Sequence, residues 1–132
     1  WRIVPEELAA AAIDGEGARL FGGQWNSVGI PVVYGAEHLS LAALEVRVHI
    51  DRMSMKKRYK FITFEFDDEL MTTLPASSLP KHWQQDPPSP SLQALDDQWL
   101  AAADSVILSV RGVNIPAEHN FLINPRHPDF RR

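Results

Sequence analysis

The most chemically suggestive segment of this chain is a glycine-punctuated stretch, residues 15–29. Glycine gives it the most permissive backbone in the sequence, and backbone N–H groups in such a loop can hold phosphate oxygens while an aromatic ring stacks on a base. The segment therefore predicts a nucleotide-binding loop. The alternative is a tight surface loop whose tryptophan is buried in the core. The residues that would bind are Arg19, Gly22, Gly23, Gln24, Trp25 and Asn26.

This glycine-rich segment matches neither of two common phosphate-binding motifs. No Gly-Lys-Ser/Thr follows the glycines, so the segment is not a P-loop. The dinucleotide fingerprint needs a strand before its glycines and a helix after them, and the sequence predicts neither here. The nucleotide interpretation therefore depends on composition and not on a known motif.

The acidic side chain of Glu45 is the second candidate, within a helix predicted over residues 40–50. A carboxylate in a cleft can stabilise positive charge that develops on a sugar during glycosyl transfer. Tyr34 ends a short apolar strand and could bring a hydroxyl to the same cleft, and His49 lies one helical turn after Glu45. Glu45 and His49 could also act as the acid and base of a ribonuclease. The alternative is that Glu45 is a solvated helix residue and Tyr34 an ordinary core residue.

Other side chains offer weaker signals. Asn120, in a polar segment around a short apolar run, could donate a hydrogen bond into a pocket or could be an ordinary residue of a C-terminal strand. The five histidines lack the paired spacing of metal ligands, and no Gly-x-Ser-x-Gly motif is present. The sequence therefore predicts neither a metal site nor a serine hydrolase triad.

Composition limits the protein's class. Thirteen basic and 17 acidic residues give a formal net charge of −4, which argues against direct nucleic-acid binding through phosphate contacts. A basic cluster at residues 52–60 is a candidate protein contact or a solvated turn. Because the chain has no cysteine, disulfides, thiolate zinc sites and a cysteine nucleophile are excluded. Without an apolar run of about 18 residues or a signal-peptide pattern, we expect a cytoplasmic protein without a membrane span.

The predicted elements make one α+β domain over residues 1–132. Helices are predicted from Ser40, with Leu41, Leu44 and Val48 on its buried face, and from Ser91 as N-cap, with Leu92, Leu95 and Trp99 at helical spacing. Alternation of large side chains over residues 58–66 indicates a strand buried on both faces. The segment 73–91 contains five prolines and is expected to be a long connection. Further strands are predicted at residues 1–4, 31–34, 106–110 and 121–123.

Taken together, these segments resemble the RES domain, the toxin component of RES–Xre toxin–antitoxin pairs. The resemblance is carried by GARLFGGQWN at residues 17–26, PVVY at 31–34 and LSLAALE at 39–45, continuing to His49. It continues with Pro116 and with NFLINPRH at residues 120–127, and Pro128 and Asp129 end the matching segment. These motifs stand in the family's order and cover nearly the whole chain.

The resemblance implies an ADP-ribosyltransferase-like fold, in which a split mixed sheet with flanking helices surrounds a cleft for NAD⁺. It implies cleavage of the bond between nicotinamide and ribose, with transfer of the ADP-ribosyl group to water, phosphate or a protein. The family glutamate falls on Glu45 and the NAD-contacting tyrosine on Tyr34. We expect Arg19 and the backbone amides of Gly22 and Gly23 to hold the pyrophosphate, with the further NAD⁺ contacts from Gln24, Trp25, Asn26, His49 and Asn120.

The resemblance also implies a partner, an Xre-type helix-turn-helix antitoxin in a hetero-oligomer. We expect this antitoxin to carry the DNA contact, because the present chain has a net charge of −4. We expect it to cover the cleft mouth near residues 15–29, where Phe21 is a candidate contact.

Two positions depart from the family pattern. The family arginine usually follows the two glycines, where this chain has Gln24, and the family serine falls on Gly112. A glutamine cannot make the charged bidentate phosphate contact of an arginine, and glycine has no hydroxyl. Arg19 and Arg111 are candidate replacements for the arginine, and Ser109 for the serine. A catalytically weak NAD-binding protein is therefore the main alternative function.

Overall fold

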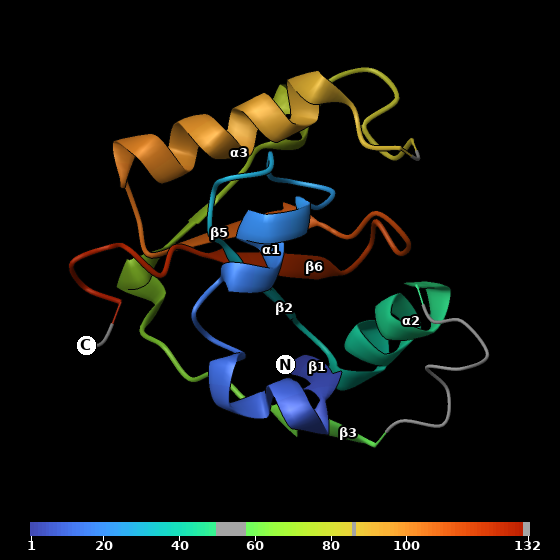
Figure 1. Ribbon diagram of the computed structural model, residues 1–132. Coiled ribbons are helices and arrows are strands. Elements are labelled where there is room, and N and C mark those ends of the chain that lie inside the picture. The colour runs from blue at the N-terminus through green and yellow to red at the C-terminus, as the bar shows by residue number, and fades with distance from the viewer. Residues whose placement is uncertain (50–57, 86, 131–132) are drawn as a thin grey trace.

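The computed structural model describes residues 1–49, 58–85 and 87–130. Within these residues, three α-helices and six strands make an α+β fold, whose arrangement is shown in Figure 1. The helices are α1 (Glu16–Phe21), α2 (Leu39–His49) and α3 (Pro90–Ala102). The strands are β1 (Arg2–Pro5), β2 (Val33–Ala36), β3 (Tyr59–Ile62), β4 (Met71–Thr73), β5 (Ile107–Arg111) and β6 (His119–Ile123). Short 3₁₀ helices span Glu6–Ala11, Asp68–Leu70 and Ala76–Ser78.

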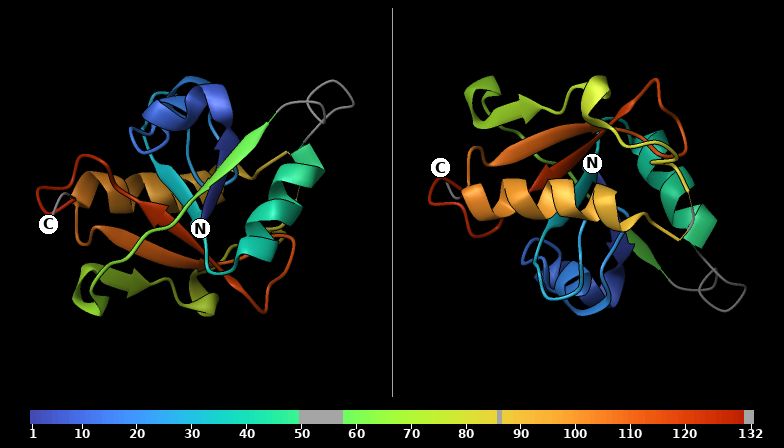
Figure 2. Two further views of the ribbon diagram at one scale, coloured as in Figure 1. Left: turned by 90° about the horizontal axis from the view of Figure 1, so that it is seen from below. Right: turned by 90° about the horizontal axis from the view of Figure 1, so that it is seen from above.

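The strands form two sheets, so the predicted split sheet is confirmed. The larger sheet has the order β2-β6-β5-β4, in which β4 is parallel to β5 and the other pairs are antiparallel. The smaller sheet pairs β1 with β3 in antiparallel register, as Figure 2 shows. The two sheets meet where the backbone of Trp1 exchanges hydrogen bonds of 2.7 and 2.8 Å with Ala36 at the end of β2.

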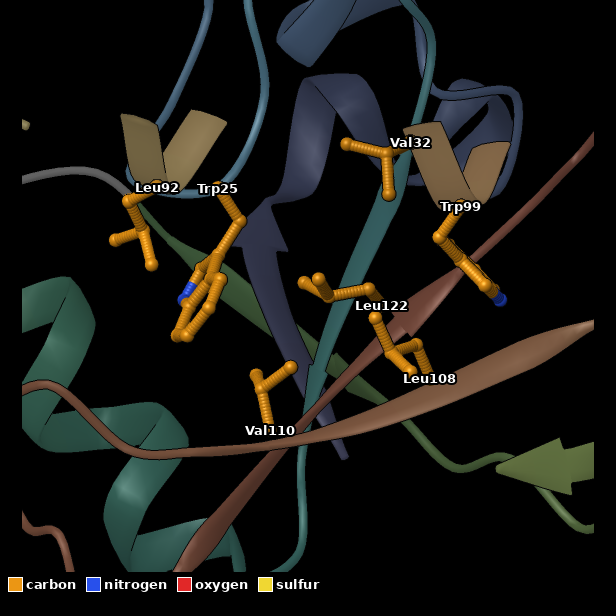
Figure 3. Close-up of a cluster of buried hydrophobic side chains, with 7 residues drawn as sticks. All are labelled: Trp25, Val32, Leu92, Trp99, Leu108, Val110 and Leu122. Atoms are coloured by element: carbon orange, nitrogen blue, oxygen red, sulfur yellow. The ribbon is translucent and has the colours of Figure 1, made fainter. Parts of the chain in front are cut away.

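Helix α3 covers one face of the four-stranded sheet (Figure 2). Leu92 and Trp99 from α3 pack on Leu108 and Leu122 from β5 and β6, and Trp25 enters the same cluster from the glycine-rich segment (Figure 3). Burial of each large apolar side chain contributes about 1.5–3 kcal/mol. The opposite face is covered by residues from the segment that follows β3 and by Phe130. None of the described helices has the length and apolar character needed to cross a membrane.

The predicted strand at 58–66 is shorter and more exposed than expected. Only Tyr59–Ile62 is a strand, and its sole described partner is β1, so that Phe61 is 62% exposed. Phe64 and Phe66 instead pack beneath the four-stranded sheet from an irregular segment. The large side chains that alternate over residues 58–66 therefore pack at two different sites, and they do not form a single strand buried on both faces.

Two predictions about the helices were also wrong in detail. The buried face of α2 is formed by Leu41 and Ala42, whereas Leu44 is 38% exposed; the side chain of Val48 lies outside the described residues. The N-cap of α3 is Ser89 and not Ser91, because Pro90 occupies the first helical position, where its missing N–H costs nothing.

The glycine-rich segment contains a helix that its glycines made unexpected. Helix α1 begins after Gly15, whose φ of +75° is the left-handed conformation that favours glycine. A Cβ at Gly15 would also lie 2.9 Å from the backbone nitrogen of Val32. The segment therefore turns sharply at Gly15, makes six helical residues and ends at Gly22.

Candidate active site

A cleft of about 940 Å³ opens between the glycine-rich segment, β1, β2 and α2. Its volume is typical of a site that encloses a small-molecule ligand. Among the described residues that line it, the charged side chains are Arg2 and Glu45. The rest of the lining is largely apolar with several neutral amides, including Gln24, Gln84 and Asn120.

Glu45 reaches the cleft because of its place on α2. It lies four residues after Leu41 and three after Ala42, so it shares the face by which α2 packs on the rest of the fold. Its carboxyl group is half-buried. Burial raises the pKa of Glu45 above its usual value, and a hydrogen bond with the Asn120 side chain acts in the opposite direction. The structure thus places a partly desolvated carboxylate in the cleft wall.

Tyr34 also lines the cleft, and its hydroxyl is held by the glycine-rich segment. The hydroxyl donates a hydrogen bond to Oδ1 of Asn26 and accepts one of 3.3 Å from the backbone nitrogen of Trp25. Burial raises the pKa of Tyr34, so the phenol stays neutral. A Cβ at Gly23 would lie 2.7 Å from this hydroxyl, which explains why the loop has glycine there.

Asn26 shapes the loop from beneath. Its side chain is fully buried, and its amide nitrogen lies 2.9–3.1 Å from the carbonyl oxygens of Ala18, Ser27 and Ile30. Asn26 is not among the residues that line the cleft, and its buried side chain holds the loop together; its contact with NAD⁺ stays a prediction. Trp25 does line the cleft, but it is 2% exposed and belongs to the core, as the alternative interpretation proposed.

The backbone amides of Gly22 and Gly23 donate hydrogen bonds to carbonyl groups of the protein itself. The nitrogen of Gly22 donates to the carbonyl of Ala18 at 2.8 Å, and that of Gly23 donates to the carbonyl of Asn26 at 3.1 Å. Both glycines line the cleft, but neither N–H is directed at a ligand in this conformation. The expected pyrophosphate cradle made of these amides is therefore not formed.

The predicted cation Arg19 lies outside the cleft lining. Its guanidinium binds the carboxylate of Glu16 at 2.8 Å on the exposed side of α1. Arg2 from β1 is in the cleft instead, where its Nη1 donates a 2.9 Å hydrogen bond to the carbonyl of Tyr34 and its buried Nε has no partner among the described residues. The sequence signal for Arg2 was an arginine inside an apolar strand, where an isolated charge needs a reason.

Gln24 lines the cleft at the family's arginine position and is held by the connection between β4 and α3. Its side-chain nitrogen donates to the carbonyl of Trp83 at 3.1 Å and lies 3.5 Å from that of Gln85. From the same connection, Gln84 donates a 2.8 Å hydrogen bond to the carbonyl of Val113. The proline-rich segment is thus tied to both sides of the cleft through neutral amides.

The proposed substitutes for the missing serine and arginine do not line the cleft. The hydroxyl of Ser109 pairs with Nδ1 of His119 at 3.0 Å, and Arg111 is exposed at the end of β5. Gly112 begins the turn between β5 and β6, where its nitrogen donates to the carbonyl of Glu118 at 2.9 Å. The hydroxyl of Ser109 therefore does not take the place of the family serine in the cleft.

Gly112 is required by this turn, which leads to a stability prediction. A Cβ at position 112 would lie 2.7 Å from the carbonyl oxygen of Ile115, so Gly112→Ala should destabilise the protein by about 1–3 kcal/mol through overpacking. Gly17→Ala is a matched control, because the same atom in α1 would meet nothing within 4 Å. Urea unfolding of the wild type and of both variants measures the effect, and a Gly112→Ala protein as stable as the wild type would contradict the packing. Restoring the family serine at position 112 therefore also requires the turn to move.

Sequence reasoning also missed a buried acid. Asp96 lies between Leu92 and Trp99 on the buried face of α3, and within the part of the chain that the structure describes neither of its carboxyl oxygens has a hydrogen-bond partner. Burial, with the neighbouring Asp97, raises the pKa of Asp96 from 3.8 to about 8. The available signal was its spacing, since position 96 continues the apolar stripe of the helix.

Three predicted contacts cannot be placed. The side chains of His49 and Phe21, and residues 52–57 of the basic cluster, lie outside the described residues.

Known proteins are similar to this chain over nearly its whole length. The family model of the RES domain matches residues 1–132. The chain is 34% identical over 131 residues to "Toxin Res" of Yersinia enterocolitica, covering 99% of this chain and 86% of that protein. It is 30% identical over 132 residues to "Toxin Res" of Photorhabdus laumondii, covering 100% of this chain and 85% of the relative.

A third relative is named for its chemistry. The "Prs ADP-ribosylating toxin" of Sphingobium sp. is 34% identical over 136 residues, covering 99% of this chain and 84% of that protein. That name is consistent with the ADP-ribosyltransferase-like fold that the family resemblance implied. The chain is a member of the RES domain family.

Proposed function

We propose that this protein is a toxin that consumes NAD⁺ by breaking the bond between nicotinamide and ribose. The observation that carries the proposal is the half-buried carboxylate of Glu45 in a cleft whose other charged described residue is the arginine Arg2. The relatives named as toxins, one of them ADP-ribosylating, support this choice of chemistry.

The main requirement of this reaction is stabilisation of the positive charge that develops on the ribose. As the bond breaks, nicotinamide leaves with the bonding electron pair, and the ribose carbon acquires the positive charge of an oxocarbenium ion. A fixed carboxylate facing that carbon lowers the barrier because its charge is already in place. Glu45 would take this role and accept hydrogen bonds from the ribose hydroxyls. The acceptor, which is water, phosphate or a protein nucleophile, then bonds to the ribose carbon and gives up a proton.

The other end of the substrate carries two phosphates. Arg2 is the cation among the described residues that line the cleft, and a guanidinium has five N–H donors. Its Nη1 donates to the carbonyl of Tyr34, so the other donors at the end of the guanidinium remain for a phosphate oxygen. Tyr34 would form the wall beside the nicotinamide, with its neutral hydroxyl fixed on Asn26. We therefore assign the pyrophosphate to Arg2, in place of Arg19 and the two glycine amides.

An NAD-binding protein with weak turnover is the second candidate, favoured by Gln24 and Gly112. Calorimetry with NAD⁺ and with product analysis of the same sample separates the two functions. Binding accompanied by released nicotinamide supports the toxin, whereas binding of intact NAD⁺ supports the second candidate.

Gln24→Arg should raise NAD⁺ affinity by about tenfold if its guanidinium reaches a phosphate, because a charged hydrogen bond contributes roughly 1.5–3 kcal/mol. Unchanged affinity would indicate that the segment at Trp83 and Gln85 still holds the side chain.

The proposal includes a partner. A protein that depletes NAD⁺ harms its own host, so we propose an Xre-type helix-turn-helix antitoxin that blocks the cleft and carries the DNA contact. Co-expression of the chain with the product of the adjacent gene, followed by purification, tests this. A stable complex that protects NAD⁺ supports the antitoxin, and a chain that is harmless when expressed alone contradicts it.

A further inference from the structure

Asn120 occupies a constrained place in the cleft wall. It lies on β6, whose backbone is paired with β2 on one side and β5 on the other, opposite Ala36 and Val110. It lines the cleft, yet it is only 5% exposed. Its backbone position is therefore fixed from both sides, and its side chain has little freedom to follow a ligand.

The Asn120 amide joins the sheet to α2. An asparagine amide has two N–H donors. The Asn120 nitrogen donates to the carbonyl of Gly35 on β2 at 3.2 Å, and the side chain also makes a hydrogen bond with Glu45 on α2. The carboxyl group that the proposed chemistry needs is thus connected directly to the centre of the sheet.

The turn between β5 and β6 passes close to the same amide. A Cβ at Gly112 would lie 3.3 Å from Oδ1 of Asn120, in addition to its contact with the carbonyl of Ile115. The amide therefore has the turn on one side, Gly35 on another and Glu45 in front. Rotation of the side chain would break both hydrogen bonds.

We infer that Asn120 is a positioning residue that holds the Glu45 carboxylate in its working orientation and does not itself bind NAD⁺. This differs from the role in NAD⁺ contact that the sequence suggested for Asn120. The kinetic consequence rests on the proposed function, but the structural one does not. Without the amide, Glu45 keeps its desolvation and loses its stabilising donor, so its pKa rises further and the carboxylate can rotate.

The test measures the titration of the Glu45 carboxyl group by NMR in unliganded protein with isotope-labelled glutamate, assigned with Glu45→Gln. Asn120→Ala should move the titration midpoint to higher pH. Asn120→Asp keeps the side-chain shape, replaces the donor by a second carboxylate, and should move it further. The other charged side chain in the described cleft lining, Arg2, is unchanged in all variants. An unmoved midpoint in both variants would overturn the inference.

Asn124→Ala is the matched control. Asn124 follows the same strand and is 3% exposed, and its nitrogen donates to the carbonyl of Leu100 at 3.4 Å, away from the cleft lining. Its loss removes a comparable buried amide, so general destabilisation would affect both variants. The Glu45 midpoint should stay at the wild-type value in this control. A shift as large as that in Asn120→Ala would overturn the inference.

Kinetics separate positioning from direct binding. If Asn120 acts through Glu45, Asn120→Ala should lower kcat by about tenfold to a hundredfold with little change in KM, as expected for a misplaced catalytic group. A raised KM with unchanged kcat would show direct contact with NAD⁺ and overturn the inference. Absence of any turnover in the wild type would contradict the proposed function, whereas the titration would still decide the role of Asn120.

Discussion

Glu45→Gln is expected to slow NAD⁺ cleavage by on the order of a hundredfold or more, which corresponds to about 2.7 kcal/mol in the barrier. Glutamine keeps the shape and the hydrogen-bonding capacity of the side chain and removes its charge. Because the positive charge on ribose develops only in the transition state, the affinity for NAD⁺ should change much less. Initial rates and calorimetric binding of the same preparation measure the two effects separately.

The control for this variant is Glu69→Gln. Glu69 is exposed in the 3₁₀ helix Asp68–Leu70 and does not line the cleft, so the substitution removes one negative charge without touching the site. Its rate should equal that of the wild type. A Glu45→Gln protein that keeps most of its activity would show that Glu45 is only a partly buried helix residue.

Asp96→Asn is expected to remove a large pH dependence of stability. The pKa of Asp96 is raised from 3.8 to about 8, so the folded protein retains a proton that the unfolded chain releases. The stability that Asp96 contributes is therefore fully present below about pH 4 and is lost as the pH rises through about 8. Relative to the variant, the wild type should lose roughly 3–6 kcal/mol between these limits.

Urea unfolding at several pH values between about 4 and 9 measures this difference. Subtracting the curve of Asp96→Asn removes the contribution of every other titrating group. Asp104→Asn is the control, because Asp104 is exposed after the end of α3 and its curve should run parallel to that of the wild type. A constant difference between wild type and Asp96→Asn at all pH values would contradict a buried, partnerless carboxyl group.

The sequence predicted the α+β class because apolar spacing marks helices and buried strands directly. It was less successful where a short element depends on tertiary contacts. Helix α1 has six residues between glycines, and its N-terminus depends on the approach of Val32 to Gly15. The strand β3 ends early because Phe64 and Phe66 pack under the other sheet. The alternation of large side chains in the sequence does not show against which sheet they pack.

The candidate site could likewise be predicted only in part from the sequence. Glu45 and Tyr34 are brought to one cleft, as their place in the recognised motifs implied. Arg2 was missed because it meets Tyr34 only through the arrangement of β1 beside β2, which joins residues far apart in the sequence. Arg19 was favoured because it lies close to the glycines in the sequence. In the structure its guanidinium forms an ion pair with Glu16, one helical turn away. The predicted contacts of His49 are not tested by the described residues.

The most direct test of the account is to incubate the purified chain with NAD⁺ and follow free nicotinamide, with water alone and with added phosphate as acceptor. We predict nicotinamide release that depends on Glu45, accompanied by ADP-ribose or its phosphorylated counterpart, or by ADP-ribosylated protein. Intact NAD⁺ under both conditions, in a preparation that unfolds cooperatively, would contradict the assignment of this cleft to NAD⁺ cleavage.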